Sequence, residues 1–153
     1  MNYWLMKSEP DVFSIDALAK APKKTAAWDG VRNYQARNFM RDGMKKGDLV
    51  FFYHSNCDEP GIYGIAKVAR EAYPDETAFE RGHDHYDPKS KRDAPQWYVV
   101  DVSFVRKFAQ PVTLERLKRH HDELPQMLIL RRGNRLSVTP VTKDEWDFVL
   151  SLV

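Results

Sequence analysis

The sequence predicts an α+β fold, in which a small mixed barrel or curled sheet is accompanied by helices. Two observations predict it. Strand-like runs of apolar and aromatic residues are unevenly spaced along the chain, and segments with helical periodicity lie between them. The strands are expected at residues 3–7, 49–54, 62–69, 96–108 and 136–138.

The expected helices begin at recognisable capping residues. Ser14 and Thr113 can each accept a hydrogen bond from a backbone N–H at the start of a helix. Thr142 and Glu145 form a capping box in front of the C-terminal helix. The expected ranges are 14–19, 32–41, 113–118, 124–128 and 142 onward. Residues 73–95 contain three prolines, many charges and little periodicity, so a long surface loop is expected there.

Length and composition limit the class of protein. The 153 residues are enough for one domain, 1–153, with its own core, and 42% of them are hydrophobic. The single cysteine, Cys57, excludes an intramolecular disulfide and a cysteine-based zinc site. No apolar run approaches the length of a membrane span, so we expect no membrane partner and a cytoplasmic location, or a nuclear one in a eukaryote.

The segment 28–38 combines the residue types that can hold a nucleobase. Trp28 offers a flat surface for stacking, and Asn33 offers both a donor and an acceptor. The helix that follows adds free N–H groups suited to a phosphate. The alternative is a Trp28 that packs on its own helix beside solvated arginines. Trp4 and Trp146 lie inside expected elements and are assigned to the core, whereas Trp28 and Trp97 flank loops.

The triplet His83-Asp84-His85 in the long loop contains three potential ligands of a divalent metal. A loop triplet without further nearby His or Cys is usually solvated. We therefore expect no metal and no cofactor.

Five ordered segments resemble the EVE domain family: 3–10, 28–38, 51–55, 71–75 and 86–88. That family belongs to the PUA-like superfamily and is similar to YTH domains, which read methylated adenine in RNA. The resemblance covers the whole chain. It implies a pseudo-barrel of about five to six strands with flanking helices. It also implies a pocket for a modified base.

The resemblance also assigns residues to the base pocket. Trp28 corresponds to one wall of an aromatic cage, and Lys7 and Ser8 correspond to polar groups that line it. Asn33 and Tyr34 follow in the turn that opens the helix.

Three further residues complete the expected pocket. Trp97 is the candidate for a second aromatic wall, and His54 for a group that fixes a loop or lines the pocket by hydrogen bonding. Tyr86, in a segment shared with EVE domains, is expected at the pocket mouth near Trp28 or Trp97.

The expected function is therefore non-enzymatic binding of a modified base in DNA or RNA. Arg32, Arg37 and Lys89 are expected to contact phosphates. Trp28→Ala is expected to remove discrimination between bases and to leave the fold intact.

Two alternatives remain open. One is a PUA-like ribonuclease or RNA-processing enzyme in which His54, Lys7 and Tyr53 supply acid–base groups. The other is an interaction module without a small pocket. The sequence favours binding, because no group is evident that would orient His54 as a base and no phosphate-binding glycine loop is present.

Overall fold

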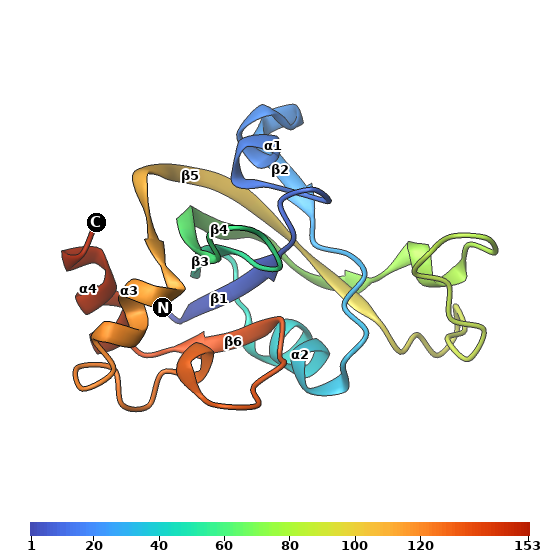
Figure 1. Ribbon diagram of the computed structural model, residues 1–153. Helices are drawn as coiled ribbons and strands as arrows, with labels where there is room; N and C mark the ends of the chain where they lie inside the picture. Colours follow the sequence, from blue (N-terminus) through green and yellow to red (C-terminus); the bar gives the residue numbers. More distant parts are fainter.

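A six-stranded mixed sheet forms the frame of the molecule (Figure 1). The computed structural model describes residues 1–153 and gives the strand order β2-β5-β4-β3-β1-β6. The strands are β1 (Tyr3–Ser8), β2 (Thr25–Ala27), β3 (Leu49–His54), β4 (Gly61–Pro74), β5 (Tyr98–Thr113) and β6 (Val138–Val141). Strands β1 and β3 are parallel, and every other neighbouring pair is antiparallel. Strands β2 and β6 form the two edges, so the expected curled α+β sheet is confirmed and is not closed.

The helices are short and begin at the expected capping residues. They are α1 (Ile15–Lys20), α2 (Tyr34–Asn38), α3 (Leu114–Arg119) and α4 (Lys143–Ser151), with short helical turns at η1 (Pro22–Lys24), η2 (Phe39–Gly43), η3 (Glu76–Phe79) and η4 (Leu128–Leu130). The side chains of Ser14, Thr113 and Thr142 cap α1, α3 and α4, and Thr142 forms the predicted capping box with Glu145. None of the helices combines the length and apolarity that a membrane span requires.

Several boundaries differ from the expectations. Strand β4 continues to Pro74, and β5 continues to Thr113, because the two strands pair along most of their length. The three-residue strand β2 was not expected, since Thr25–Ala27 carries too little pattern to be recognised. Helix α2 begins at Tyr34, not at residue 32, because Asn33 is its N-cap.

The C-terminal part shows the same kind of displacement. Strand β6 begins two residues later than the expected 136 and includes Pro140. A proline is compatible with β6 because this strand forms an edge of the sheet. The helix expected at 124–128 is replaced by the η4 turn at Leu128–Leu130.

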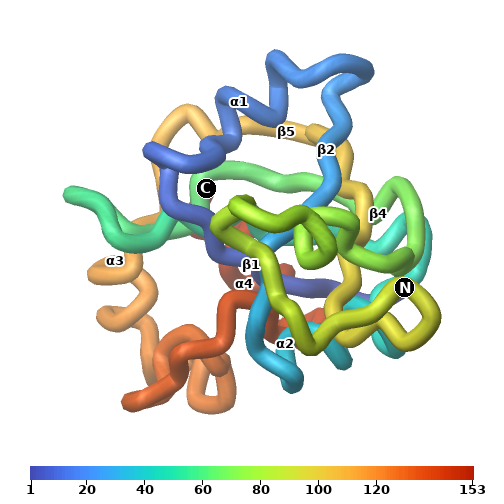
Figure 2. The backbone as a smooth tube through the Cα atoms, turned by 90° about the vertical axis from the view of Figure 1, so that its right-hand side faces the viewer, coloured from blue at the N-terminus to red at the C-terminus, as the bar shows by residue number.

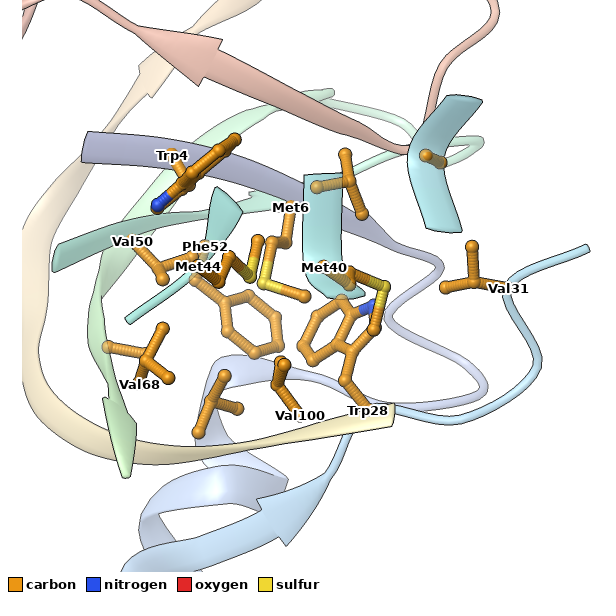
Figure 3. Close-up of a cluster of buried hydrophobic side chains, with 14 of the residues drawn as sticks. Trp4, Met6, Trp28, Val31, Met40, Met44, Val50, Phe52, Val68 and Val100 are labelled. Atoms are coloured by element: carbon orange, nitrogen blue, oxygen red, sulfur yellow. The ribbon is translucent and has the colours of Figure 1, made fainter. Parts of the chain in front are cut away.

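Two apolar clusters lie on opposite faces of the sheet. Along β1, Trp4 and Met6 contribute to one cluster and Leu5 to the other, as strand alternation requires. The first cluster is covered by α1 and α2, and Figure 3 shows its side chains. The second is covered by α3 and α4 and contains Trp146, stacked on Phe51 at 3.8 Å between ring centroids. The predicted core positions of Trp4 and Trp146 are confirmed.

Candidate functional site

A cavity of about 330 Å³ opens where β1 ends and β2 meets the long loop after β4. Its volume lies within the usual range of about 300–1,000 Å³ for small-ligand pockets. Figure 2 views this side of the molecule, with the end of β1, the α1–β2 segment and the yellow-green loop around residue 85 near one another. The lining residues are Lys7, Ser8, Val12, Phe13, Ala26, Ala27, Trp28, Asp29, Gly30 and His85.

Trp28 forms part of this cavity and part of the core. The backbone N–H of Trp28 donates to the carbonyl of Val100 at 2.8 Å, and this hydrogen bond extends the pairing of β2 with β5. The ring meets Phe52 edge-on at 5.3 Å between centroids, and only 7% of the residue is exposed. Figure 3 shows Trp28 among Phe52, Met40 and Val100. The expectation that Trp28→Ala leaves the fold intact does not fit this burial.

Phe13 supplies the second aromatic wall. Its ring lies 6.4 Å from that of Trp28, with an angle of 81° between the two planes. The Ser8 hydroxyl donates to the Phe13 carbonyl at 2.7 Å and so closes the loop that follows β1. Ser8 thus both lines the cavity and fixes one of its walls.

Asp29 and His85 bring polar groups to the cavity. The Asp29 carboxylate is 45% exposed, and one of its oxygens lies 4.0 Å from His85 Nδ1. The His85 ring packs against Gly30, where a β-carbon would lie 2.6 Å from two ring atoms. Gly30 has φ of +78°, so glycine is required there by conformation as well as by space.

Lys7 lines the cavity at the end of β1 and is half-buried. Its backbone N–H donates to the carbonyl of Ser137 at 2.8 Å, while its ammonium has no hydrogen-bond or ion-pair partner in the chain. Burial lowers the pKa of Lys7 below its usual value.

Asp75 and Arg32 form a clamp that holds the His85 loop against the turn after Trp28. The buried Asp75 carboxylate accepts from the Gly30 N–H and from Arg32 Nη1, each at 3.0 Å. Arg32 also donates from Nε and Nη2 to the carbonyl of His85, at 3.1 and 2.7 Å. The guanidinium donors are thus directed to acceptors inside the protein, and the phosphate contact expected of Arg32 stays a prediction.

The ionisation of Asp75 fits this structural role. Burial by itself would raise the pKa of Asp75, but hydrogen bonds from Thr77, Gly30 and Arg32 outweigh it. The net effect is a pKa below the usual value. Asp75 is therefore negatively charged at neutral pH and balances the positive charge of Arg32.

Trp97 belongs to a different cluster and does not line the cavity. Its ring stacks on Tyr34 at 4.7 Å between centroids, and its indole N–H donates to Asp87 at 2.6 Å. The guanidinium of Arg32 lies 5.4 Å from the Trp97 ring centroid. Because Trp97 is 5% exposed, it packs the base of the loop and leaves the second cavity wall to Phe13.

The Trp97 cluster also engages Arg37. Its Nη1 donates to the carbonyl of Gln96 at 2.9 Å, and its guanidinium lies 4.8 Å from the Tyr34 ring centroid. Arg37 therefore holds the end of the long loop, and its expected phosphate contact stays a prediction. Lys89 is exposed, and its backbone N–H donates to Asp87.

Asn33 and His54 act as backbone caps outside the cavity lining. The Asn33 side chain accepts from the Ala36 N–H, and His54 Nε2 accepts from the Ile15 N–H at 3.1 Å. His54 is buried beneath Tyr63, whose ring stacks on it at 4.1 Å. Burial lowers the pKa of His54, which favours the neutral ring that this hydrogen bond requires. Its predicted role in fixing a loop agrees with this contact.

Tyr86 lies between His85, which lines the cavity, and Asp87, which accepts from Trp97. Tyr86 is half-buried and does not itself line the cavity, but its segment borders the cavity through His85. In the triplet before it, His83 Nδ1 accepts from the His85 N–H at 3.0 Å. The structure brings no group of three His, Cys, Asp or Glu side chains into a metal-binding arrangement.

Phe13, Asp29 and His85 were not among the predicted pocket residues. Asp29 is adjacent to Trp28 in the sequence, which could have indicated it. The sequence indicates His85 only as a potential metal ligand. Phe13 reaches the cavity through the turn closed by Ser8, and that turn leaves no periodic signal.

Comparison with known proteins gives matches across almost the entire chain. A family model described as the EVE domain matches residues 2–152. Thymocyte nuclear protein 1 of mouse (Mus musculus) is 53% identical over 167 residues, which cover 99% of this chain and 73% of the mouse protein. A crystal structure of human THYN1 in complex with 5-methylcytosine-containing DNA has a TM-score of 0.95 and 51% identity, covering 99% of this chain and 97% of that one. A crystal structure of a Pseudomonas putida protein has a TM-score of 0.93 and 49% identity, covering 98% of each chain.

Proposed function

This chain belongs to the EVE domain family, and from that premise we propose that it binds a 5-methylcytosine-type base in DNA. The base leaves its stack and enters the cavity beside Trp28. The observation that carries the proposal is this cavity of about 330 Å³, which is lined by two aromatic side chains, Trp28 and Phe13. The similarity of this chain to human THYN1, whose crystal structure is a complex with 5-methylcytosine-containing DNA, supports the choice of ligand.

The apolar walls provide for the ring and its methyl group. A base gains about 1–3 kcal/mol from stacking on an aromatic side chain. A methyl group gains further from an apolar enclosure, which Phe13, Val12 and the alanines of β2 can supply. These contacts favour a methylated base over its unmodified form.

Asp29 provides for the polar edge of the base. A carboxylate accepts hydrogen bonds only, and aspartate or glutamate recognises cytosine through its exocyclic amino group. Thymine carries the same methyl group but has a carbonyl in place of that amino group. Asp29 would therefore disfavour thymine, because the two acceptors would face one another.

We further propose that binding occurs without turnover. In the enzymatic alternative, Tyr53, His54 and Lys7 would share a reaction site. Neighbouring strand residues point to opposite faces, and Tyr53 packs in the cluster that contains Trp146. Burial raises the pKa of Tyr53 to about 12, and His54 Nε2 is occupied by the Ile15 N–H. This arrangement favours a binding role.

The test compares three oligonucleotides that differ at one position, which carries 5-methylcytosine, cytosine or thymine. Binding is measured by fluorescence anisotropy for the parent and for Asp29→Asn. We expect the parent to prefer 5-methylcytosine to both others. Asp29→Asn should reduce the preference over thymine most, because the amide can also donate a hydrogen bond to a carbonyl. Equal affinity of the parent for all three would contradict the proposal.

A matched pair of phenylalanines tests the apolar wall. Phe13 and Phe39 are both half-buried and both lie near a tryptophan, at 6.4 Å from Trp28 and 5.8 Å from Trp4 between ring centroids. Only Phe13 lines the cavity. Phe13→Ala should therefore lower the preference for 5-methylcytosine over cytosine, while Phe39→Ala should preserve it. An equal loss in both variants would indicate an effect on the fold alone.

A further inference from the structure

The loop 131–136, between η4 and β6, contains arginines that the fold does not use. Arg132 and Arg135 are exposed and have no hydrogen-bond or ion-pair partner in the chain. Their situation differs from that of Arg32 and Arg37, whose guanidinium groups bind backbone carbonyls. It also differs from that of Arg119, which pairs with Glu115 at 2.6 Å.

The backbone of this arginine loop is held from within. Asn134 donates from Nδ2 to the carbonyl of Leu128 at 2.9 Å, and its Oδ1 accepts from the Leu136 N–H at 3.2 Å. Gly133 has φ of +79°, which permits the tight turn between the two arginines. The loop is thus ordered by contacts that leave Arg132 and Arg135 free.

The sheet brings this loop to the cavity. Ser137, which directly follows the loop, accepts the backbone N–H of Lys7 at 2.8 Å, and Lys7 lines the cavity. Arg135 is two residues from Ser137, a separation of at most about 7 Å along an extended chain. In Figure 1 the orange segment that enters β6 lies near the end of β1, in agreement with this hydrogen bond.

We propose that the arginine loop binds the DNA phosphates that flank the base in the cavity. This inference rests on the proposed function. It adds that the bound DNA strand passes the cavity on the side where β6 begins. Arginine forms paired hydrogen bonds with phosphate, and its contacts to the backbone position a strand without reading its sequence. The exposed acids Asp11 and Asp29, in the loop after β1 and the turn after β2, would repel a phosphate, whereas Arg132 and Arg135 would attract one.

The test uses the double variant Arg132→Gln/Arg135→Gln and the control Lys45→Gln/Lys46→Gln. Both remove two exposed positive charges. Lys45 and Lys46 precede β3, and the Leu49 N–H donates to the carbonyl of Asn2, at the opposite end of β1 from Lys7. Affinity for 5-methylcytosine and cytosine oligonucleotides is measured over a series of salt concentrations.

We expect the arginine variant to bind both oligonucleotides more weakly by the same factor. The slope of log affinity against log salt is negative, and its magnitude should decrease by about 2, one for each lost phosphate contact. The control should retain the parent slope. Equal slopes in the two variants would overturn the inference, and so would a change in the preference for 5-methylcytosine. A parent protein without that preference would instead contradict the proposed function.

Discussion

Trp28 and Trp97 have similar exposure, 7% and 5%, yet their surroundings differ. Beside Trp28 the neighbouring segments leave a cavity of about 330 Å³. Around Trp97 the ring of Tyr34, the carboxylate of Asp87 and two guanidinium groups occupy the available positions. The same residue type, placed beside a loop in both cases, becomes a cavity wall in one region and packing in the other.

The difference comes from what lies opposite each ring. Trp28 is followed by Asp29 and Gly30, which have little side-chain volume to fill the space. Trp97 faces the first turn of α2, where Tyr34 is long enough to reach it. An aromatic residue near a loop therefore indicates a site only when its neighbours are too small to cover it.

The largest expected effect is that of removing either indole. Trp28→Ala and Trp97→Ala should each lower the free energy of unfolding by about 3–5 kcal/mol, since each leaves a void among buried side chains. Urea denaturation measures this loss. The two variants should then differ in the presence of ligand. A 5-methylcytosine oligonucleotide at a hundred times its Kd should raise the free energy of unfolding of Trp97→Ala by about 2.7 kcal/mol. The free energy of unfolding of Trp28→Ala should not change. Stabilisation of both would show that the cavity does not hold the base.

The next effect concerns the clamp between Asp75 and Arg32. Asp75→Ala should cost about 2–3 kcal/mol, less than a fully buried pair because the Arg32 side chain is 24% exposed. Glu76→Gln is the control, since its pair with Arg92 lies at the surface and contributes about 0.5 kcal/mol or less. Thermal unfolding compares the two. A loss in Asp75→Ala no greater than in the control would disprove the clamp.

A smaller effect is expected from Tyr34→Ala, which removes the stacking partner of Trp97. The lost stack contributes about 0.5–1.5 kcal/mol to stability beyond the area it buries. Affinity for 5-methylcytosine DNA should remain that of the parent, because Tyr34 does not line the cavity. Weaker binding by a folded Tyr34→Ala protein would mean that the Trp97 cluster is itself a stacking site for bases.

The smallest effect is a dependence of stability on pH at His54. Burial lowers the pKa of His54 below 6.5 in the folded state, so the unfolded chain binds this proton more readily. The contribution is therefore complete above pH 6.5 and is lost as the pH falls through the folded-state pKa. His54→Phe should flatten this part of the stability profile relative to the parent. Identical profiles of stability against pH in urea denaturation would show that burial does not lower the pKa of His54 in the folded state.

The sequence predicted the frame of the fold well because local signals determine it. Three helices are predicted by the capping side chains of Ser14, Thr113 and Thr142, and each helix is observed. The apolar runs in β1 and β3 likewise require burial. By contrast, β2 exists only because β5 offers a free edge, and a three-residue strand without a pattern of its own cannot be recognised in advance.

The site was predicted less completely because charge alone does not reveal a partner. Lys7, Ser8 and Trp28 line the cavity as expected from the family resemblance. The position of Arg32 close to Trp28 in the sequence predicts a phosphate contact, yet the buried Asp75 that binds Arg32 lies 43 residues away in the sequence. Only the folded structure shows which arginines already have partners.

The double role of Trp28 limits how such a cavity can diverge. A substitution there alters the ligand site and removes part of the core at the same time. New ligand preferences are therefore more accessible through Val12, Asp29 and His85, which line the cavity and remain partly exposed. Along an evolving lineage, the indole would persist while the residues around the opening exchange, so relatives could share one scaffold and differ in the base they prefer.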